Sequence, residues 1–141
     1  MRDQLDEVEG TNAPPVLRVL LYSDNRQTRE AVLTAVGTRA AKDLPTLEWV
    51  EVATHAAVVS RVEEGGLDLL VLDGEAGKSG GMGLCRQLKD EILQCPPILV
   101  LIGRQQDRWL ASWSEADAVA ARPLDQLLLQ ETVARLLRVP A

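Results

Sequence analysis

Short apolar runs alternate with amphipathic segments along most of this chain, and the two patterns predict strands and helices in turn. The strands are expected at residues 17–22, 47–52, 67–73, 98–102 and 118–121, and the helices at about 27–40, 55–64, 82–93, 107–114 and 125–139. A regular alternation of this kind indicates an α/β protein in which helices cover both faces of a parallel sheet. We therefore predict a doubly wound, five-stranded parallel sheet in the order 2-1-3-4-5.

The predicted strand at residues 67–73 is almost continuously apolar, ends in the carboxylate of Asp73 and is followed by a glycine-rich segment. Continuous hydrophobicity is typical of a strand that is buried on both faces. In the predicted order the first and third strands are neighbours, so Asp24, just after the first strand, should lie near Asp73 in the crevice at the carboxyl ends. Two carboxylates there could hold Mg²⁺ beside a phosphoryl group, and one of them could act as a nucleophile.

Length, charge and cysteine content limit the possible function classes. The 141 residues suit a single domain, with residues 1–16 as a flexible acidic tail and residues 17–139 as the folded unit. A net charge of -6 argues against a nucleic-acid-binding surface. The acidic N-terminus is not a secretory signal, and no apolar run is long enough to span a bilayer, so we expect a cytoplasmic protein without membrane insertion. Cys85 and Cys95 should be free thiols without metal-ligand spacing.

Four sequence pieces, in order and over about residues 17–137, resemble the CheY-like receiver domains of two-component response regulators, which have a flavodoxin-like (βα)5 fold. The pieces are LRVLLYSDNRQTRE, DLLVLDGE with GGMGLCRQLKDE, PPILVLIGR and ADAVAARPLD. The resemblance implies a signalling protein rather than an enzyme, with Asp73 as the acceptor of a phosphoryl group from a histidine kinase. It also implies that Asp24, Asp73 and the backbone carbonyl of Glu75 hold Mg²⁺.

Several positions depart from the receiver pattern and indicate an atypical site. Ser23 stands where a second acidic residue is usual, which should weaken Mg²⁺ binding. Arg122 replaces the usual Lys with a planar head that does not act as an ammonium does. Ile102 replaces the usual Thr or Ser and cannot donate a charge-assisted hydrogen bond to a phosphoryl oxygen, a contact worth roughly 1.5–3 kcal/mol. Val119 stands where an aromatic switch residue is common.

Trp109 and Trp113 lie four residues apart on one predicted helix and so share a face. A helix this short cannot easily bury two Trp side chains, and an exposed aromatic pair is a good anchor for a protein partner. In receivers this helix, with the fifth strand and the last helix, forms the usual partner surface.

The chain is similar in particular to the stand-alone, orphan receivers of actinobacteria, which carry no output domain. The similarity lies in YSDN, VEVAT, LDGE, GGMG, CPPILVL and WLASWS. It implies output through protein contacts and makes a respiratory complex, the type I NADH dehydrogenase, a candidate partner. The main hypothesis is an atypical receiver in a phosphorelay, and the alternative is a phosphorylation-independent accessory subunit of a larger complex. The sequence does not predict the oligomeric state.

Two enzyme classes share parts of this pattern but fit less well. A flavodoxin-like flavin protein would need a glycine-containing phosphate loop after the first strand, where this chain has Ser23-Asp24-Asn25-Arg26-Gln27. A haloacid-dehalogenase-like phosphatase would place its Asp-x-Asp motif after the first strand, whereas Asp73-Gly74-Glu75 follows the third.

Overall fold

A five-stranded parallel sheet forms the centre of the protein in a computed structural model that describes residues 15–76, 80–104 and 107–138. The strands are β1 (Val16–Tyr22), β2 (Thr46–Val52), β3 (Leu69–Asp73), β4 (Ile98–Ile102) and β5 (Ala118–Ala121). Their order is β2-β1-β3-β4-β5, with every neighbouring pair parallel. The predicted doubly wound, flavodoxin-like fold and its strand order are confirmed.

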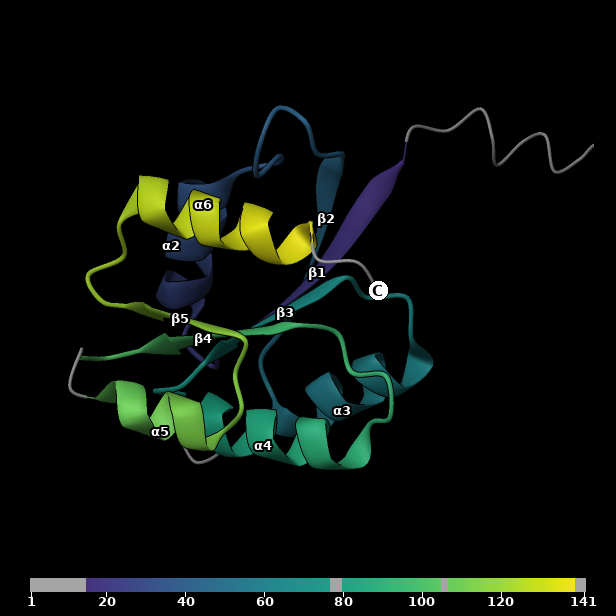
Figure 1. The fold of residues 1–141 in the computed structure, drawn as a ribbon, viewed down its shortest axis with the longest axis vertical. Helices are drawn as coiled ribbons and strands as arrows, with labels where there is room; N and C mark the ends of the chain where they lie inside the picture. Colours follow the sequence, from purple (N-terminus) through teal and green to yellow (C-terminus); the bar gives the residue numbers. More distant parts are fainter. Residues whose placement is uncertain (1–14, 77–79, 105–106, 139–141) are drawn as a thin grey trace, which may run out of the picture.

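In the described part of the chain, four helices connect the strands and a fifth follows the last strand, and together they lie in two layers (Figure 1). They are α2 (Arg26–Val36), α3 (His55–Glu64), α4 (Gly81–Glu91), α5 (Arg108–Trp113) and α6 (Gln126–Leu137). Helices α2 and α6 cover one face of the sheet, and α3, α4 and α5 cover the other. Side chains of Asn25, Thr54 and Asp125 cap the first turns of α2, α3 and α6, as expected for these residue types at helix starts.

Aliphatic side chains fill a separate core on each face of the sheet. Alternate residues of the strands point to opposite sides, so Leu70 and Leu72 pack toward α3 and α4, whereas Leu69 and Val71 pack toward α2 and α6. All five residues of β3 and of β4 are buried. This explains why these two segments read as uninterrupted apolar runs in the sequence.

Most predicted boundaries agree with the structure, and the differences have local causes. The helix expected to reach residue 40 ends at Val36, because Gly37 adopts a positive φ of 78° and its N–H caps the carbonyl of Leu33. The first strand begins at Val16, one residue before the expected domain start. Residues 1–14 and 139 lie outside the described residues, so the tail and the C-terminal limit of the domain stay predictions.

Two further expectations concern the whole chain. Cys85 and Cys95 are free thiols, as predicted. Among the described residues, no helix is long and apolar enough to cross a membrane.

Candidate functional site

The carboxyl ends of the strands bring the predicted site residues to one edge of the sheet. Asp73 is the last residue of β3, and Ser23 and Asp24 directly follow β1, its neighbour in the sheet. Ile102 ends β4, and Arg122 follows β5. Residues that are far apart in the sequence therefore meet where an open α/β sheet places its ligand crevice.

The carboxylate of Asp73 is buried, with 2% of the residue exposed, and both of its oxygens accept hydrogen bonds from the protein. The Ser23 hydroxyl donates to Oδ2 at 2.7 Å. The Arg122 guanidinium donates from Nη2 to Oδ1 at 2.8 Å, and the Glu75 backbone N–H donates to the same oxygen at 2.9 Å. A buried carboxylate is tolerated only when it is paired and hydrogen-bonded, and Asp73 meets both conditions within the chain.

Ser23 is itself held firmly in the loop after β1. It is fully buried, and its Oγ accepts a hydrogen bond from the Asn25 N–H at 3.0 Å. Its carbonyl accepts a hydrogen bond from Arg29 Nη1 at 2.7 Å, and Arg29 also pairs with Glu51 of β2. The hydroxyl of Ser23 is therefore aimed at Asp73 by a network that joins β1, α2 and β2.

Arg122 links three elements at the same edge. Its backbone N–H donates to the Ile102 carbonyl at 3.0 Å, which continues the pairing of β5 with β4. Besides the contact with Asp73, its Nη1 lies 3.5 Å from Oγ1 of Thr28, a mostly buried residue in the first turn of α2. The Arg122 side chain remains 30% exposed, so it is partly hydrated.

The other predicted site residues are less closely joined to Asp73. Asp24 is exposed on the loop beside Ser23, and the Glu75 side chain is also exposed. Ile102 is fully buried in the core toward α3 and α4, and Val119 packs against the same core. Ile102 thus acts as a core residue in this structure, whereas Val119 is partly buried at the edge of that core.

Tyr22, the last residue of β1, reports the negative charge of this edge. Burial raises the pKa of its phenol, and the nearby carboxylates of Asp24 and Asp73 raise it further. Both carboxylates are therefore close enough to Tyr22 to act on it electrostatically, in agreement with the predicted approach of the two loops.

The residues present do not fit a divalent cation well. Among the described residues, no group of three His, Cys, Asp or Glu side chains comes together, so at most two carboxylates could hold an ion at this edge. Where a second carboxylate could supply a lone pair, Ser23 directs a hydrogen at Asp73, and Arg122 already places a positive charge 2.8 Å from the carboxylate. Mg²⁺ requires near-ideal octahedral oxygen coordination, so a carboxylate engaged by three donors is a poor ligand for it.

The aromatic pair, Trp109 and Trp113, lies on α5 away from this carboxylate. The two residues are 68% and 53% exposed, so they are not core residues. Arg86 of α4 stacks over the Trp113 ring at 5.1 Å and donates to the Trp113 carbonyl at 2.7 Å, which fixes α5 against α4. Large exposed aromatic residues on a fixed helix are suited to protein contact.

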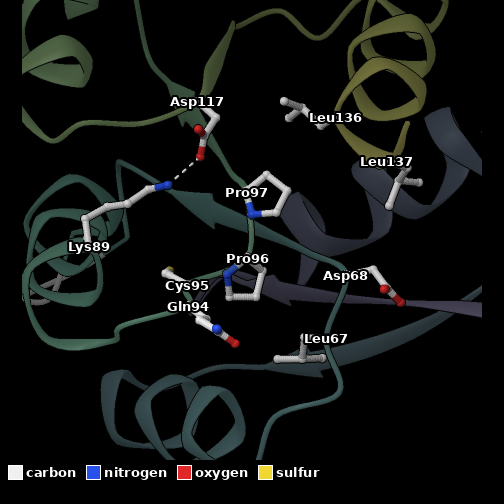
Figure 2. A pocket seen from close by; sticks show the side chains of 10 residues that line it. All are labelled: Leu67, Asp68, Lys89, Gln94, Cys95, Pro96, Pro97, Asp117, Leu136 and Leu137. Atoms are coloured by element: carbon white, nitrogen blue, oxygen red, sulfur yellow. Dashed lines mark hydrogen bonds and ion pairs between the residues drawn. The ribbon is translucent and has the colours of Figure 1, made fainter. Parts of the chain in front are cut away.

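A pocket of about 640 Å³ lies at the opposite, amino-terminal edge of the sheet (Figure 2). It is lined by Leu67, Asp68, Lys89, Gln94, Cys95, Pro96, Pro97, Asp117, Leu136 and Leu137. Lys89 points at Asp117 and pairs with it at 2.7 Å, and Asp117 also accepts the Ile98 N–H. Asp68 accepts the Arg18 N–H. These charged groups serve the fold, and the pocket is remote from Asp73.

Sequence reasoning identified Asp73 and Arg122 but missed two contacts. Ser23 was expected only to weaken the site, whereas it donates the hydrogen bond that holds Oδ2. Thr28 was not singled out at all. Its position five residues after Ser23, in the first turn of the helix that follows β1, is the only sequence signal that could have placed it near the strand ends.

Comparison with known proteins agrees with this architecture, although no protein-family model matches the chain. A response regulatory protein of Mycobacterium tuberculosis is 57% identical over 125 residues, which cover 89% of this chain and 94% of that protein. A response regulator of Chloroflexus aurantiacus has a TM-score of 0.71 at 20% identity, covering 89% of this chain and all of that one. A chemotaxis response regulator of Vibrio cholerae has a TM-score of 0.71 at 16% identity, covering 86% and 99%.

The two kinds of similarity carry different weight. The solved structures are less than 25% identical to the chain and support the fold alone. The mycobacterial relative is much closer and spans nearly the whole length of both proteins. Taken with the 2-1-3-4-5 sheet and the strand-end carboxylate, this identity shows that the chain belongs to the response regulators of two-component signalling and that its fold is that of a receiver domain.

Proposed function

We propose that this receiver acts through protein contacts in its unmodified form, as a regulatory or accessory subunit of a larger complex. The observation that carries the proposal is the state of Asp73, whose charge is already balanced by Arg122 and whose two oxygens are both hydrogen-bonded. A phosphoryl group would have to be attached to an oxygen that already accepts a hydrogen bond within the chain, at a residue that is 2% exposed.

The residues that would transmit a phosphorylation signal are also missing. Ile102 is buried and has no hydroxyl for a phosphoryl oxygen. Val119, where an aromatic switch residue is common, is an aliphatic residue partly buried against the core. Moving a two-state domain from 1:99 to 99:1 requires about 5.5 kcal/mol of differential binding. The missing hydroxyl contact at position 102, worth roughly 1.5–3 kcal/mol, is a large part of this differential binding energy.

The proposed contact surface is centred on the aromatic pair. Trp109 and Trp113 are exposed on α5, and a hollow of about 380 Å³ nearby is lined by Arg108, Val119 and Leu128 among others. Leu128 of α6 is 60% exposed, so exposed apolar side chains are found on both α5 and α6. The type I NADH dehydrogenase, named by resemblance, remains the candidate partner.

A second candidate function is the phosphorelay, in which Asp73 accepts a phosphoryl group from a histidine kinase. It is favoured by the position of Asp73 at the carboxyl end of β3 and by the Arg122 guanidinium, which could stabilise negative charge on phosphoryl oxygens. The two functions differ in whether Asp73 becomes modified and whether that modification matters.

Partner binding by an Asp73→Asn variant tests the main proposal. Purified type I NADH dehydrogenase from the source organism is incubated with the wild type and with the variant, and the bound receiver is measured. We expect equal binding, because Asn has the shape of Asp but cannot be phosphorylated. Binding that requires Asp73 and rises after treatment with a phosphodonor would favour the phosphorelay, and absence of binding by either form would exclude this complex as the partner.

A further inference from the structure

Donors of the chain itself balance the charge of Asp73 and engage both of its oxygens. Three donors from three parts of the fold reach the carboxylate: Ser23 after β1, the Glu75 N–H after β3, and Arg122 after β5. A carboxylate has about four lone-pair sites, so this arrangement satisfies most of them. A receiver site that relies on a divalent cation would instead leave oxygens directed at the ion.

We propose that Ser23 and Arg122 form a built-in counter-ion system that makes this acidic edge independent of divalent cations, and that Ser23 is the residue that determines this independence. The inference rests on the proposed function in that the unmodified domain is the working form. It concerns cation binding, however, and is tested without a partner or a phosphodonor.

The identity of residue 23 matters because its side chain is buried next to Asp73. The Ser23 hydroxyl lies 2.7 Å from Oδ2, so a carboxylate in its place would bring two negative charges together in a buried site. Two carboxylates that share a site repel each other, so either one of them takes up a proton or a bound cation lets both stay ionised. A serine removes that requirement, because it donates a hydrogen bond instead of adding a charge.

The planar guanidinium of Arg122 contacts Asp73 and a second element at the same time. Nη2 reaches Asp73 while Nη1 lies against Thr28 on α2, so one planar group spans β3, β5 and α2. An ammonium is a compact charge without this fork and could not make both contacts from a fixed position. The guanidinium therefore supplies at once the positive charge and the bridge between elements.

Binding of Mn²⁺, used as a spectroscopic substitute for Mg²⁺, tests the proposal in the full chain. Electron paramagnetic resonance measures the free ion in titrations of the wild type, Ser23→Asp and Ser60→Asp. The last variant is a matched control, because Ser60 is exposed on α3 and adds the same charge away from the site. We expect Ser23→Asp to bind Mn²⁺ roughly 10–100-fold more tightly than the wild type or the control.

Ser23→Asp could also fold only when the ion is present, so its circular dichroism is recorded in chelator and in Mn²⁺. Folding that depends on the ion supports the proposal, as does tighter binding by a folded variant. A folded variant that binds no better than Ser60→Asp would overturn it.

If Ser23→Asp does not fold under either condition, Mn²⁺ binding by the wild type and by Asp24→Asn tests the proposal instead. Wild-type binding with a Kd below about 1 mM that Asp24→Asn weakens would contradict cation independence, and the absence of such binding supports it. Because no phosphodonor or partner is used, this result can differ from the outcome for the proposed function. If the site binds no cation but Asp73 becomes phosphorylated, the inference on cation independence holds and the proposed function of the unmodified domain does not.

Discussion

At the scale of single residues, the contact between Asp73 and Arg122 joins a buried carboxylate to a partly exposed guanidinium. Buried ion pairs often add little net stability, because desolvation offsets the attraction, but removing one partner leaves a buried charge without compensation. The pair should therefore matter most when it is broken on one side only.

A double-mutant cycle tests this expectation. Arg122→Gln should lower the free energy of unfolding by about 3 kcal/mol, the low end for a broken buried pair because Arg122 is partly hydrated. In the Asp73→Asn background the same change should cost much less, since no buried charge remains. Urea denaturation of the wild type, both single variants and the double variant measures the coupling, and strictly additive costs would show that the two side chains do not act as a pair.

Cys85 gives a second prediction at this scale. It is fully buried, and desolvation raises the pKa of its thiol to about 11, so at pH 8 only about one part in a thousand is thiolate. N-ethylmaleimide should therefore modify the native protein at Cys95, which is half-buried, and reach Cys85 only after unfolding. Peptide mass spectrometry locates the label, and equal labelling of both cysteines in the native protein would contradict the burial of Cys85.

The same raised pKa makes stability depend on pH in a definite direction. The unfolded Cys85 thiol ionises at its ordinary pKa, whereas the folded thiol keeps its proton up to about pH 11. The Cys85 thiol therefore makes its full contribution to the free energy of unfolding at pH 8. That contribution is lost as the pH rises from the ordinary thiol pKa to about 11.

The positions of site residues could be predicted from the sequence, but the direction of a side-chain hydrogen bond could not. Asp73 and Arg122 could be placed because each follows an apolar strand, and parallel strands end at the same edge. The role of Ser23 could not be predicted, because it depends on the direction of one hydroxyl, which its neighbours Asn25 and Arg29 fix in space. Pattern alone carries no such information.

At the scale of elements, the glycine-rich segment after β3 has a steric role that its composition only suggested. Helix α4 begins at Gly81, directly against the backbone of Asp73, and a Cβ there would lie 2.7 Å from the Asp73 carbonyl oxygen. Gly83, two residues on, has open space around the same position. One glycine is thus required by packing and the other is not.

Alanine substitutions at these two glycines should have opposite effects. Gly81→Ala should destabilise the domain by about 1–3 kcal/mol, because the rigid backbone of β3 must move to admit the methyl group. Gly83→Ala is the matched control and should stabilise α4 by roughly 0.5–1 kcal/mol, since glycine is unfavourable within a helix. Thermal unfolding followed by circular dichroism compares them, and a neutral Gly81→Ala would show that α4 does not pack this closely on Asp73.

Hydrophobic periodicity predicted the helices and strands of the described residues well, but it predicted their ends less accurately. The α3 helix and the strands β4 and β5 have the predicted bounds, because turn residues or prolines flank them closely. The helix after β1 was expected to reach residue 40, past Gly37. The positive φ of Gly37 ends it, and composition does not reveal which glycine will adopt such a conformation.

At the scale of the whole molecule, the two edges of the sheet and the outer face of α5 have different roles. The carboxyl edge holds a self-balanced charge, and the amino edge holds a pocket whose charged groups are paired within the fold. Trp109 and Trp113 remain on the surface, fixed through the contact of Trp113 with Arg86. This arrangement supports the proposal that the domain acts by holding a partner.

Removing the aromatic pair should abolish partner binding without unfolding the domain. Trp109→Ala combined with Trp113→Ala deletes two exposed rings, so the free energy of unfolding should change little while the affinity for the partner falls sharply. Leu93→Ala is the matched control, because Leu93 is 98% exposed and apolar but lies beyond α4, outside the proposed surface. Affinity is measured by biolayer interferometry, and undiminished binding by the double variant would move the contact surface elsewhere.

The central claim is that the unmodified domain, with Asp73 engaged by Arg122 and Ser23, is the working form. Its most direct test is the intact mass of the wild type after incubation with acetyl phosphate, with and without Mg²⁺, beside Asp73→Asn. The account predicts an unchanged mass under every condition, because both oxygens of Asp73 are already bonded. A phosphoryl adduct that forms on the wild type and is absent from Asp73→Asn would contradict it and establish the phosphorelay function instead.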